Sequence, residues 1–225
     1  HERLGIRKYE PPEPLSMGGE NEKDPGFLPH YDIEGLRRWP DVLIPGEEVV
    51  IHEKLHGASG RWAWRQDRMW VASHGCFKKA PHDEHPATIW WRVAKQYDLV
   101  ARLETEPGLA IYGEVYGQVQ DLRYGVEPGG LRLAVFDVFD TEDRRWLDFD
   151  AATAAILRMG LPAVPLLHRG AWSPDLVCHA DGQSTLAGHV REGMVVKPVI
   201  ERRDDRLGRV ILKMHGEGFL TRKAR

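Results

Sequence analysis

The sequence predicts an α+β fold whose sheets are mainly antiparallel. Runs of β-branched and aromatic residues outnumber helical patterns, and no strand–helix–strand alternation links them. The 225 residues, 42% hydrophobic and 29% charged, have the composition of one large globular domain, which excludes disorder as the main state. Turn residues separate the expected strands, which lie at 48–52, 61–73, 110–116, 131–140, 194–199 and 209–214.

Each strand has its own signal. The run 48–52 (EVVIH) is rich in β-branched residues, leads into Lys54 and is interrupted by Gly57. The segment 61–73 (RWAWRQDRMWVAS) contains two aromatic-rich strands around a polar Gln-Asp turn. The segment 131–140 (LRLAVFDVFD) alternates with a period of two, which is typical of a strand with one buried face.

Two segments have helical spacing. Residues 87–104 follow a proline, repeat apolar residues at helical intervals and stop at a Pro-Gly pair. Residues 151–159 (AATAAILRM) follow Asp150, a suitable N-cap, and are closed by Gly160. We expect one continuous helix in each segment.

Charge and turn residues are unevenly distributed. We expect 1–30 to form an N-terminal connector and lead-in, because Pro, Gly and charged residues crowd 10–30 and predict a surface loop outside the core. A net charge of −3 excludes a chain that holds nucleic acid by overall basicity. Residues 191–225 carry 10 Lys/Arg against 5 Asp/Glu, so a polyanion is expected to bind there.

The chain is expected to be cytoplasmic. No apolar run approaches the ~20 residues needed to cross a bilayer, and the N-terminus lacks the apolar core of a signal peptide. Two cysteines are too few for a disulfide framework. Because residue 1 is His rather than Met, we also expect that a preceding segment has been removed.

The segment His52-Glu53-Lys54-Leu55-His56 matches H-E-x-x-H, the pattern of zinc proteases. Histidines four positions apart can bind one Zn²⁺ only on a helix. On a strand, at about 3.3 Å per residue, they lie roughly 13 Å apart. Because β-branched residues precede the motif and glycines come after it, the zinc interpretation is disfavoured.

Lys54 gives the same segment a second interpretation, as a nucleophile at a strand end. A lysine with the ordinary pKa of about 10.4 is almost fully protonated at neutral pH, and each unit of depression requires ~1.4 kcal/mol. Burial or a nearby metal cation would favour the neutral amine. The lysine of an isolated K-x-H-G is more often a solvated surface lysine. The motif therefore indicates a nucleophile only together with the charged residues further along the chain.

Five charged residues interrupt the later apolar strands. A charge in such a strand is costly unless it is paired or faces a polar cleft, and a series of them indicates a lined site. Carboxylates can bind ribose hydroxyls or Mg²⁺, lysines can bind phosphate oxygens, and Phe136 can stack on a base. The sequence therefore predicts a nucleotide pocket that involves Glu114, Asp137, Glu192, Lys197 and Lys213.

The ordered segments EKLHG, IYGEVYG, VFDVF, EGMVVKP and VILKM resemble motifs I, III, IIIa, IV and V of the covalent nucleotidyltransferases. This superfamily comprises RNA ligases, DNA ligases and mRNA capping enzymes. K-L-H-G together with E-G-x-V-x-K-P is similar to ATP-dependent RNA ligases of the RNA ligase 2 type. The resemblance implies two mainly antiparallel sheets with flanking helices around a nucleotide cleft, an ATP-grasp-like adenylylation domain formed by residues 31–225.

The resemblance also implies roles for the residues around the nucleoside. Lys54 would be the nucleophile that carries AMP, with ATP as the cofactor. Glu53 would contact adenine or support that contact, and Glu114 would hold the ribose. Phe136 would stack on the base, with Phe139 as the less favoured choice.

Metal and phosphate contacts are implied in the same way. Glu192, together with Glu114, would serve a Mg²⁺ or Mn²⁺ ion, and Lys197 and Lys213 would face the phosphates. Three further positions in the expected nucleotide site depart from the RNA ligase 2 pattern. Asn, Arg and Lys are usual there, and this chain has Ser59, His74 and His215. The departures bear on how the RNA 5′-phosphate and the leaving pyrophosphate are held.

The reaction implied by the resemblance has three phosphoryl transfers: AMP to Lys54, AMP to an RNA 5′-phosphate, and sealing by a 3′-hydroxyl. The expected substrate is RNA or a nicked duplex with such ends, as in RNA repair. The opening LGIRKYEPPEP resembles the segment before the catalytic domain in an RNA ligase family with an N-terminal OB domain. A capping-type enzyme that uses GTP and a non-catalytic nucleotide- or RNA-binding module remain alternatives.

Overall fold

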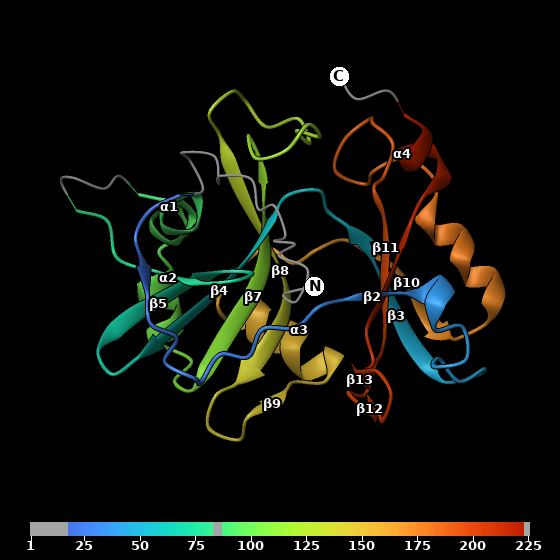
Figure 1. The fold of residues 1–225 in the computed structure, drawn as a ribbon, viewed down its shortest axis with the longest axis horizontal. Coiled ribbons are helices and arrows are strands. Elements are labelled where there is room, and N and C mark those ends of the chain that lie inside the picture. Colours follow the sequence, from blue (N-terminus) through green and yellow to red (C-terminus); the bar gives the residue numbers. More distant parts are fainter. Residues whose placement is uncertain (1–17, 83–86, 223–225) are drawn as a thin grey trace, which may run out of the picture.

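The computed structural model describes residues 18–82 and 87–222, and a seven-stranded antiparallel sheet forms one half of it (Figure 1). The strands follow the order β1-β6-β5-β4-β7-β8-β9. In that order they are β1 (Asn21–Glu22), β6 (Phe77–Lys78), β5 (Arg68–Ser73), β4 (Ala58–Arg65), β7 (Leu109–Gly117), β8 (Leu131–Asp140) and β9 (Arg145–Trp146).

A five-stranded sheet forms the other half, with the order β10-β3-β11-β14-β2. Its neighbours are antiparallel except β14 and β2, which are parallel. The strands are β10 (Leu166–Ala171), β3 (Glu48–Lys54), β11 (Gly193–Pro198), β14 (Leu212–His215) and β2 (Glu34–Gly35), and a separate pair joins β12 (Arg203–Asp204) to β13 (Gly208–Arg209). The expected α+β class with mainly antiparallel sheets is confirmed.

The chain passes from one sheet to the other immediately after Lys54. This residue ends β3 in the five-stranded sheet, and Ala58 begins β4 in the seven-stranded sheet. Gly57 lies between them so close to β7 that a Cβ would be 2.1 Å from the Val115 carbonyl oxygen. Only glycine fits at this crossing. Lys54 therefore lies where the two sheets meet.

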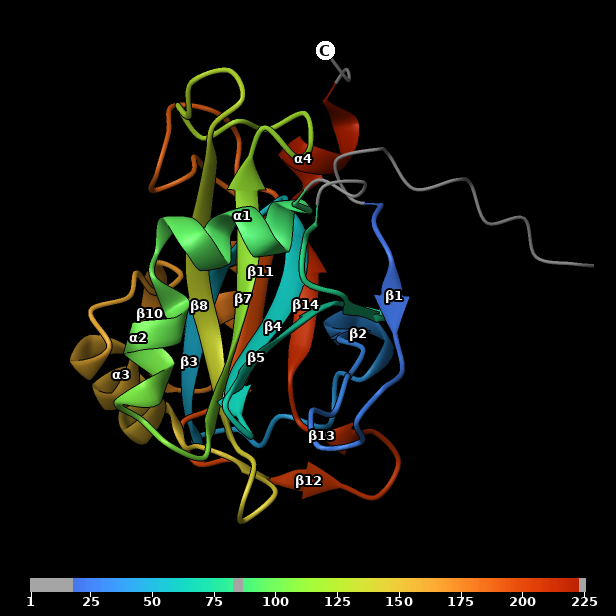
Figure 2. The same ribbon diagram turned by 90° about the vertical axis from the view of Figure 1, so that its left-hand side faces the viewer.

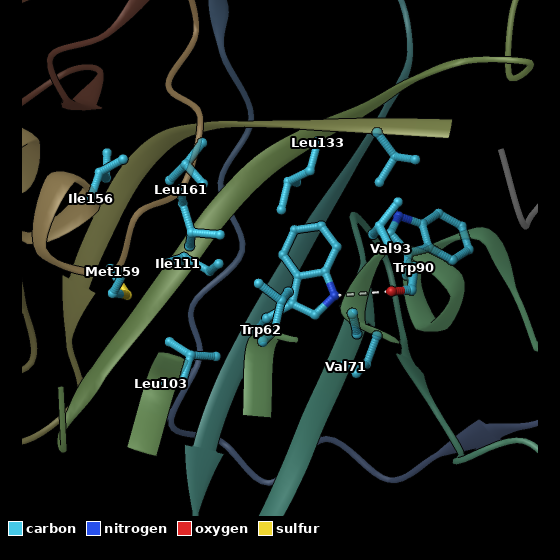
Figure 3. Packing of buried hydrophobic residues seen from close by; sticks show 14 of the residues in the cluster. Trp62, Val71, Trp90, Val93, Leu103, Ile111, Leu133, Ile156, Met159 and Leu161 are labelled. Atoms are coloured by element: carbon cyan, nitrogen blue, oxygen red, sulfur yellow. Dashed lines mark hydrogen bonds between the residues drawn. The ribbon is translucent and has the colours of Figure 1, made fainter. Parts of the chain in front are cut away.

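Helices cover one face of the seven-stranded sheet (Figure 2). Helices α1 (Ile89–Gln96) and α2 (Leu99–Glu104) lie across it, and α3 (Phe149–Arg158) packs against β8. The fully buried Trp62 lies in the core beneath α1, where its indole N–H donates to the Trp90 carbonyl at 3.1 Å (Figure 3). In the ranges 18–82 and 87–222 the other helices are α4 (Glu217–Thr221) and 3₁₀ turns at Leu36–Arg38 and Pro174–Ala180.

The expected helix over 87–104 is in fact two helices. The chain turns between α1 and α2 at Asp98, whose φ of +48° lies in the left-handed region that interrupts a right-handed helix. The start of α3 also differs from the expectation. Asp148, not Asp150, occupies the N-cap position, and Asp150 instead pairs with Arg169 at 2.6 Å. Local spacing predicted helical conformation but not these boundaries.

The expectation that 10–30 runs outside the core is wrong for its last part. Asn21–Glu22 forms β1 against β6, and Phe27 and Leu28 are buried in a cluster with Ala72 and Phe77. Residues 10–17 lie outside the described ranges. The apolar Phe-Leu pair was too short to predict a core segment among so many turn residues. Within the residues that the structure describes, no helix is long and apolar enough to cross a membrane.

Candidate active site

A cavity of about 310 Å³ opens between the two sheets. Strands from both sheets line it, together with residues 30–33 that lead into β2. Most of the residues expected at a nucleotide site line this one cavity: Glu53, Lys54, Ser59, His74, Glu114, Phe136, Lys197 and Lys213. Glu192 lies beside it and contacts both Lys54 and His215.

Glu192 is the carboxylate next to the Lys54 amine. Antiparallel pairing of β3 with β11 places Gly193 opposite Lys54, so Glu192 lies just before the start of the neighbouring strand. Glu192 Oε1 is 2.9 Å from Lys54 Nζ, 3.3 Å from His56 Nδ1 and 3.6 Å from His215 Nε2. Burial raises the pKa of Glu192, but hydrogen bonds from His56 and Lys54 outweigh it and lower the pKa overall. The second oxygen, Oε2, is buried and has no hydrogen-bond partner among the described residues.

Glu114 extends this negative side of the cavity. Burial raises its pKa to about 8, the nearby Lys54 opposes that shift, and the charge of Glu192 adds to it. A divalent cation would give both carboxylates a positive partner, at the free oxygen of Glu192 and at the half-buried Glu114. The donor set therefore fits a hard cation that prefers oxygen ligands. Among the described residues no group of three or more His, Cys, Asp or Glu forms a metal site by itself.

His56 contacts carboxylates from both halves of the fold. Its Nε2 lies 2.9 Å from Asp121 Oδ1, in the loop between β7 and β8, while its Nδ1 faces Glu192. Asp121 in turn accepts two hydrogen bonds from Arg222 at 2.9 and 2.7 Å, just after α4. Sequence patterns did not indicate Asp121, and they indicated Arg222 only as part of the basic stretch 191–225, because neither residue lies in a strand or in a patterned motif.

The zinc interpretation of His52-Glu53-x-x-His56 is excluded by the backbone. His52, Glu53 and Lys54 lie in β3, and the two imidazoles have different environments. Burial, and secondarily the charge of Lys197, lowers the pKa of His52 to about 3. Its ring packs against Phe149 at 5.7 Å between centroids, whereas His56 faces Asp121 and Glu192.

The two phenylalanines of the VFDVF segment have separate surroundings. Phe136 is half-buried and lines the cavity, whereas Phe139 is buried in the core and packs edge-on against Trp146 at 4.9 Å. The β7–β8 ladder shifts its register here, because Tyr112 pairs with Asp137 but Gly113 pairs with Val135. This β-bulge leaves Phe136 as the extra residue, so that Phe136 and its neighbour Asp137 both line the cavity.

Asp137 is the centre of a buried ionic network that joins the sheets. It accepts hydrogen bonds from Lys197, on β11, and from both terminal nitrogens of Arg209 at 2.7 and 2.9 Å. Tyr31 also donates to it, and Glu201 pairs with Arg209 and lies 3.5 Å from Lys197. Burial would raise the pKa of Asp137, but Arg209 and Lys197 hold it well below its usual range. Sequence patterns indicated Lys197 and Asp137, but not Arg209, Tyr31 or their connection.

The three positions that depart from the RNA ligase 2 pattern lie at different parts of the site. Ser59 is on β4, paired in register with Glu114. His74 is exposed at the cavity mouth, with its Nε2 3.2 Å from Asp32 Oδ1. His215 ends β14 and stacks on Phe219 at 6.0 Å between centroids.

The C-terminal stretch is not a free basic surface as a whole. Arg191, Lys197 and Arg209 are buried, and Arg202 pairs with Glu47 at 2.7 Å. Arg206 pairs with Asp41 at 2.9 Å. Much of the positive charge in this stretch is therefore buried or paired with acidic residues of the same chain.

Residues 47–215 match the family model described as RNA ligase. The chain belongs to the RNA ligase family. The segment matched contains Lys54 and every other strand-borne residue of the cavity, from His52 to Lys213. No curated protein sequence matches the chain.

Solved structures support the fold of this RNA ligase family member. The Naegleria gruberi RNA ligase with pyrophosphate superposes with a TM-score of 0.81 at 22% identity, covering 97% of this chain and 65% of that one. A variant of the same enzyme with AMP and manganese gives 0.79 at 22% identity, covering 97% and 65%. A variant with ATP and manganese gives 0.79 at 21% identity, covering 97% and 64%. The chain thus spans about 65% of the length of these relatives.

Proposed function

We propose that the chain is the adenylylation domain of an ATP-dependent RNA ligase and that Lys54 is its nucleophile. One observation carries the proposal. The Lys54 amine lies at a cavity between two sheets, beside a buried carboxylate, within the segment that matches the RNA ligase family. The proposed domain is 31–225, and 1–30 is its lead-in, of which Asn21–Glu22 adds an edge strand and Phe27 and Leu28 pack on the domain.

The first step is attack of the Lys54 amine on the α-phosphorus of ATP. A bond forms between Nζ and phosphorus, the bond from phosphorus to the bridging oxygen breaks, and pyrophosphate leaves with that electron pair. The amine must be neutral to attack and it loses its remaining extra proton as the phosphoramidate forms. Glu192, at 2.9 Å, orients the nitrogen and is the nearest acceptor for a proton.

The other residues in and beside the cavity bind the nucleotide in this proposal. Phe136 stacks on adenine, and Glu53 accepts a hydrogen bond from the base. Glu114 holds the ribose. The remaining contacts are to the phosphates and are assigned to Ser59, His74, Lys197, Lys213 and His215.

The phosphate contacts depend on charges that the fold holds in place. The Lys197 ammonium is fixed by Asp137 and has Glu201 3.5 Å away, so it is pre-oriented rather than mobile. Pre-oriented cations stabilise charge that develops on a transferring phosphoryl group without reorganising. Glu192 and Glu114 would hold Mg²⁺ or Mn²⁺, directly or through water, and that ion would neutralise charge on the phosphates.

The later steps belong to the same proposal. AMP passes from Lys54 to an RNA 5′-phosphate, and a 3′-hydroxyl then displaces AMP and seals the strand. The substrate is RNA or a nicked duplex with those ends, and an N-terminal OB domain is a proposed partner. The solved relatives are structures of an RNA ligase with pyrophosphate, with ATP and manganese, or with AMP and manganese, which supports the same ligands here.

Glu53 favours ATP over GTP, the nucleotide of the capping-type alternative. Its buried carboxylate lines the cavity and its Oε1 has no hydrogen-bond partner within the described ranges. Adenine presents an amine to such an acceptor, whereas guanine presents a carbonyl oxygen at the corresponding position. Two acceptors facing each other in a buried site cost free energy.

The test is a labelling experiment with divalent cation and either α-labelled ATP or GTP. Wild type is expected to form a covalent adduct with ATP, and Lys54→Ala is expected to form none while remaining folded by circular dichroism. Lys54→Arg should also fail, because guanidinium does not deprotonate to a nucleophile. Lys95→Ala, an exposed position on α1, is the matched control and should label normally.

Each alternative has its own outcome. Labelling of the Lys54→Ala variant would overturn the assignment of the nucleophile. Preferential labelling with GTP would indicate a capping-type enzyme. Binding of nucleotide or RNA without any adduct would indicate a non-catalytic module.

A further inference from the structure

The two carboxylate oxygens of Glu53 have different surroundings. Its side chain is fully buried, and Oε2 accepts hydrogen bonds from the Thr185 backbone N–H at 2.8 Å and the Thr185 hydroxyl at 2.7 Å. Arg191 Nε lies 4.0 Å from the same oxygen. Oε1 has no hydrogen-bond partner in the part of the chain that the structure describes. The hydrogen bonds among the described residues therefore all reach Oε2, and Oε1 is the oxygen of this cavity-lining residue that has no partner.

The loop that contains Thr185 is braced by a buried guanidinium, that of Arg191. Thr185 lies in the segment 181–192, which joins the 3₁₀ turn Pro174–Ala180 to β11. Arg191 donates to the carbonyl oxygens of His179 at 2.7 Å and Gln183 at 2.9 Å, and Gln183 forms a β-bridge with Val190. The loop thus closes on itself with Thr185 at a fixed distance from Glu53. No motif in the sequence indicated this segment.

We propose that Thr185 is a positioning residue that sets the nucleobase preference of the cavity through Glu53. This inference rests on the proposed function, and it adds a residue outside the nucleotide motifs. The paired donors of Thr185 fix the carboxylate plane, so that Oε1 faces the exocyclic amine of a 6-aminopurine. A 6-oxopurine would bring a carbonyl oxygen to the same acceptor. Without the hydroxyl, the carboxylate can turn toward Arg191 and the discrimination weakens.

The variants distinguish the effect of the Thr185 hydroxyl from the effects of its backbone N–H and of side-chain size. Thr185→Val removes the hydroxyl, keeps the backbone N–H and preserves the shape, while Thr185→Ser keeps the hydroxyl and removes the methyl group. Thr105→Val is the matched control, because that exposed hydroxyl bonds to the Arg102 carbonyl on α2, away from the cavity. Glu53→Gln is the positive control, since an amide can turn its NH₂ group toward a carbonyl oxygen.

The measurement is the rate of adduct formation with ATP and with GTP, as a function of nucleotide concentration. A hydrogen bond to a charged group is worth enough to change an equilibrium about tenfold or more. Thr185→Val is therefore expected to raise the KM for ATP and to narrow the ratio of ATP to GTP efficiency about tenfold, with a smaller change in the maximal rate. Thr185→Ser and Thr105→Val are expected to keep the wild-type ratio.

A ratio for Thr185→Val within about twofold of wild type would overturn the inference. Calorimetric binding of ATP and GTP to the Lys54→Ala variant, with and without Thr185→Val, gives the same ratio without any covalent step. If wild type forms no adduct, the proposed function fails, and the binding ratio still decides the role of Thr185. If Thr185→Val proves unfolded by circular dichroism, Thr185→Ala replaces it in both measurements.

Discussion

Glu192 Oε1 lies 2.9 Å from Lys54 Nζ, across the pairing of β3 with β11. The same oxygen contacts His56 and His215, so one carboxylate holds two imidazoles together with the amine. Side-chain exposure is 6% for Glu192 and 23% for Lys54, which places the pair at the inner edge of the cavity. Substitution of the carboxylate should therefore act directly on the nucleophile.

Glu192→Gln is expected to slow adduct formation strongly. The amide keeps the size of the side chain but removes the negative charge that orients Lys54 and His56 and that would serve the metal ion. Loss of one preorganised electrostatic contact typically costs about 10²–10³ in rate. Single-turnover labelling with ATP measures the effect. Glu104→Gln, at the exposed end of α2, is the control, and an equal rate for Glu192→Gln and wild type would contradict the proposed role.

Asp137→Asn is expected to destabilise the fold by about 3–5 kcal/mol, because it removes the charge that two buried cations share and leaves them only Glu201. Lys197 and Arg209 have side-chain exposures of 3% and 6%, so water does not replace the lost partner. Urea unfolding followed by circular dichroism gives the free energy of unfolding. Asp150→Asn breaks an exposed pair with Arg169 and should change it little. Equal free energies of unfolding for the two variants would show that the buried network does not stabilise the fold.

His52→Leu is expected to flatten the dependence of stability on pH. Burial, and secondarily the charge of Lys197, lowers the pKa of His52 in the folded state to about 3. The unfolded chain protonates this histidine below its ordinary pKa of about 6.5 and so binds more protons than the folded chain. The contribution of His52 to the free energy of unfolding is therefore fully present above pH 6.5 and is lost as the pH decreases toward 3.

The size of this effect depends on the slope of about 1.4 kcal/mol per pH unit for one proton. Between pH 6.5 and 5, wild type should lose about 1.6 kcal/mol more than His52→Leu. Urea titrations at several pH values compare the two chains. Parallel curves for wild type and variant would show that His52 titrates alike in the folded and unfolded states.

Local sequence patterns predicted most of the longer strands, although not β10, and most of the cavity. The alternation in 131–140 and the β-branched run before Lys54 are encoded by neighbours in the chain, and both segments are strands. The pattern did not predict the bulge at Phe136, because its register depends on pairing with β7. It also missed the break at Asp98, where the helical spacing continues but the backbone turns.

Local patterns did not predict the residues whose partners are far away along the chain. Asp121 and Thr185 lie in loops, and Arg209 lies at a strand end. Thr185 contacts a partner 132 positions away along the chain, and Arg209 contacts one 72 positions away. A polar residue in a loop looks the same in the sequence whether it meets water or a buried partner. Only the packed structure distinguishes these cases.

The sequence by itself determined which residue types are available to the cavity: a lysine at a strand end, acids and bases inside apolar strands, and a glycine after the lysine. Tertiary structure alone decided which of these charges are free and which are neutralised. It placed Lys54 beside Glu192 and committed Asp137 to Lys197 and Arg209. The physical reason is that the chain leaves one sheet for the other at Lys54, so the charges meet only when both sheets have formed.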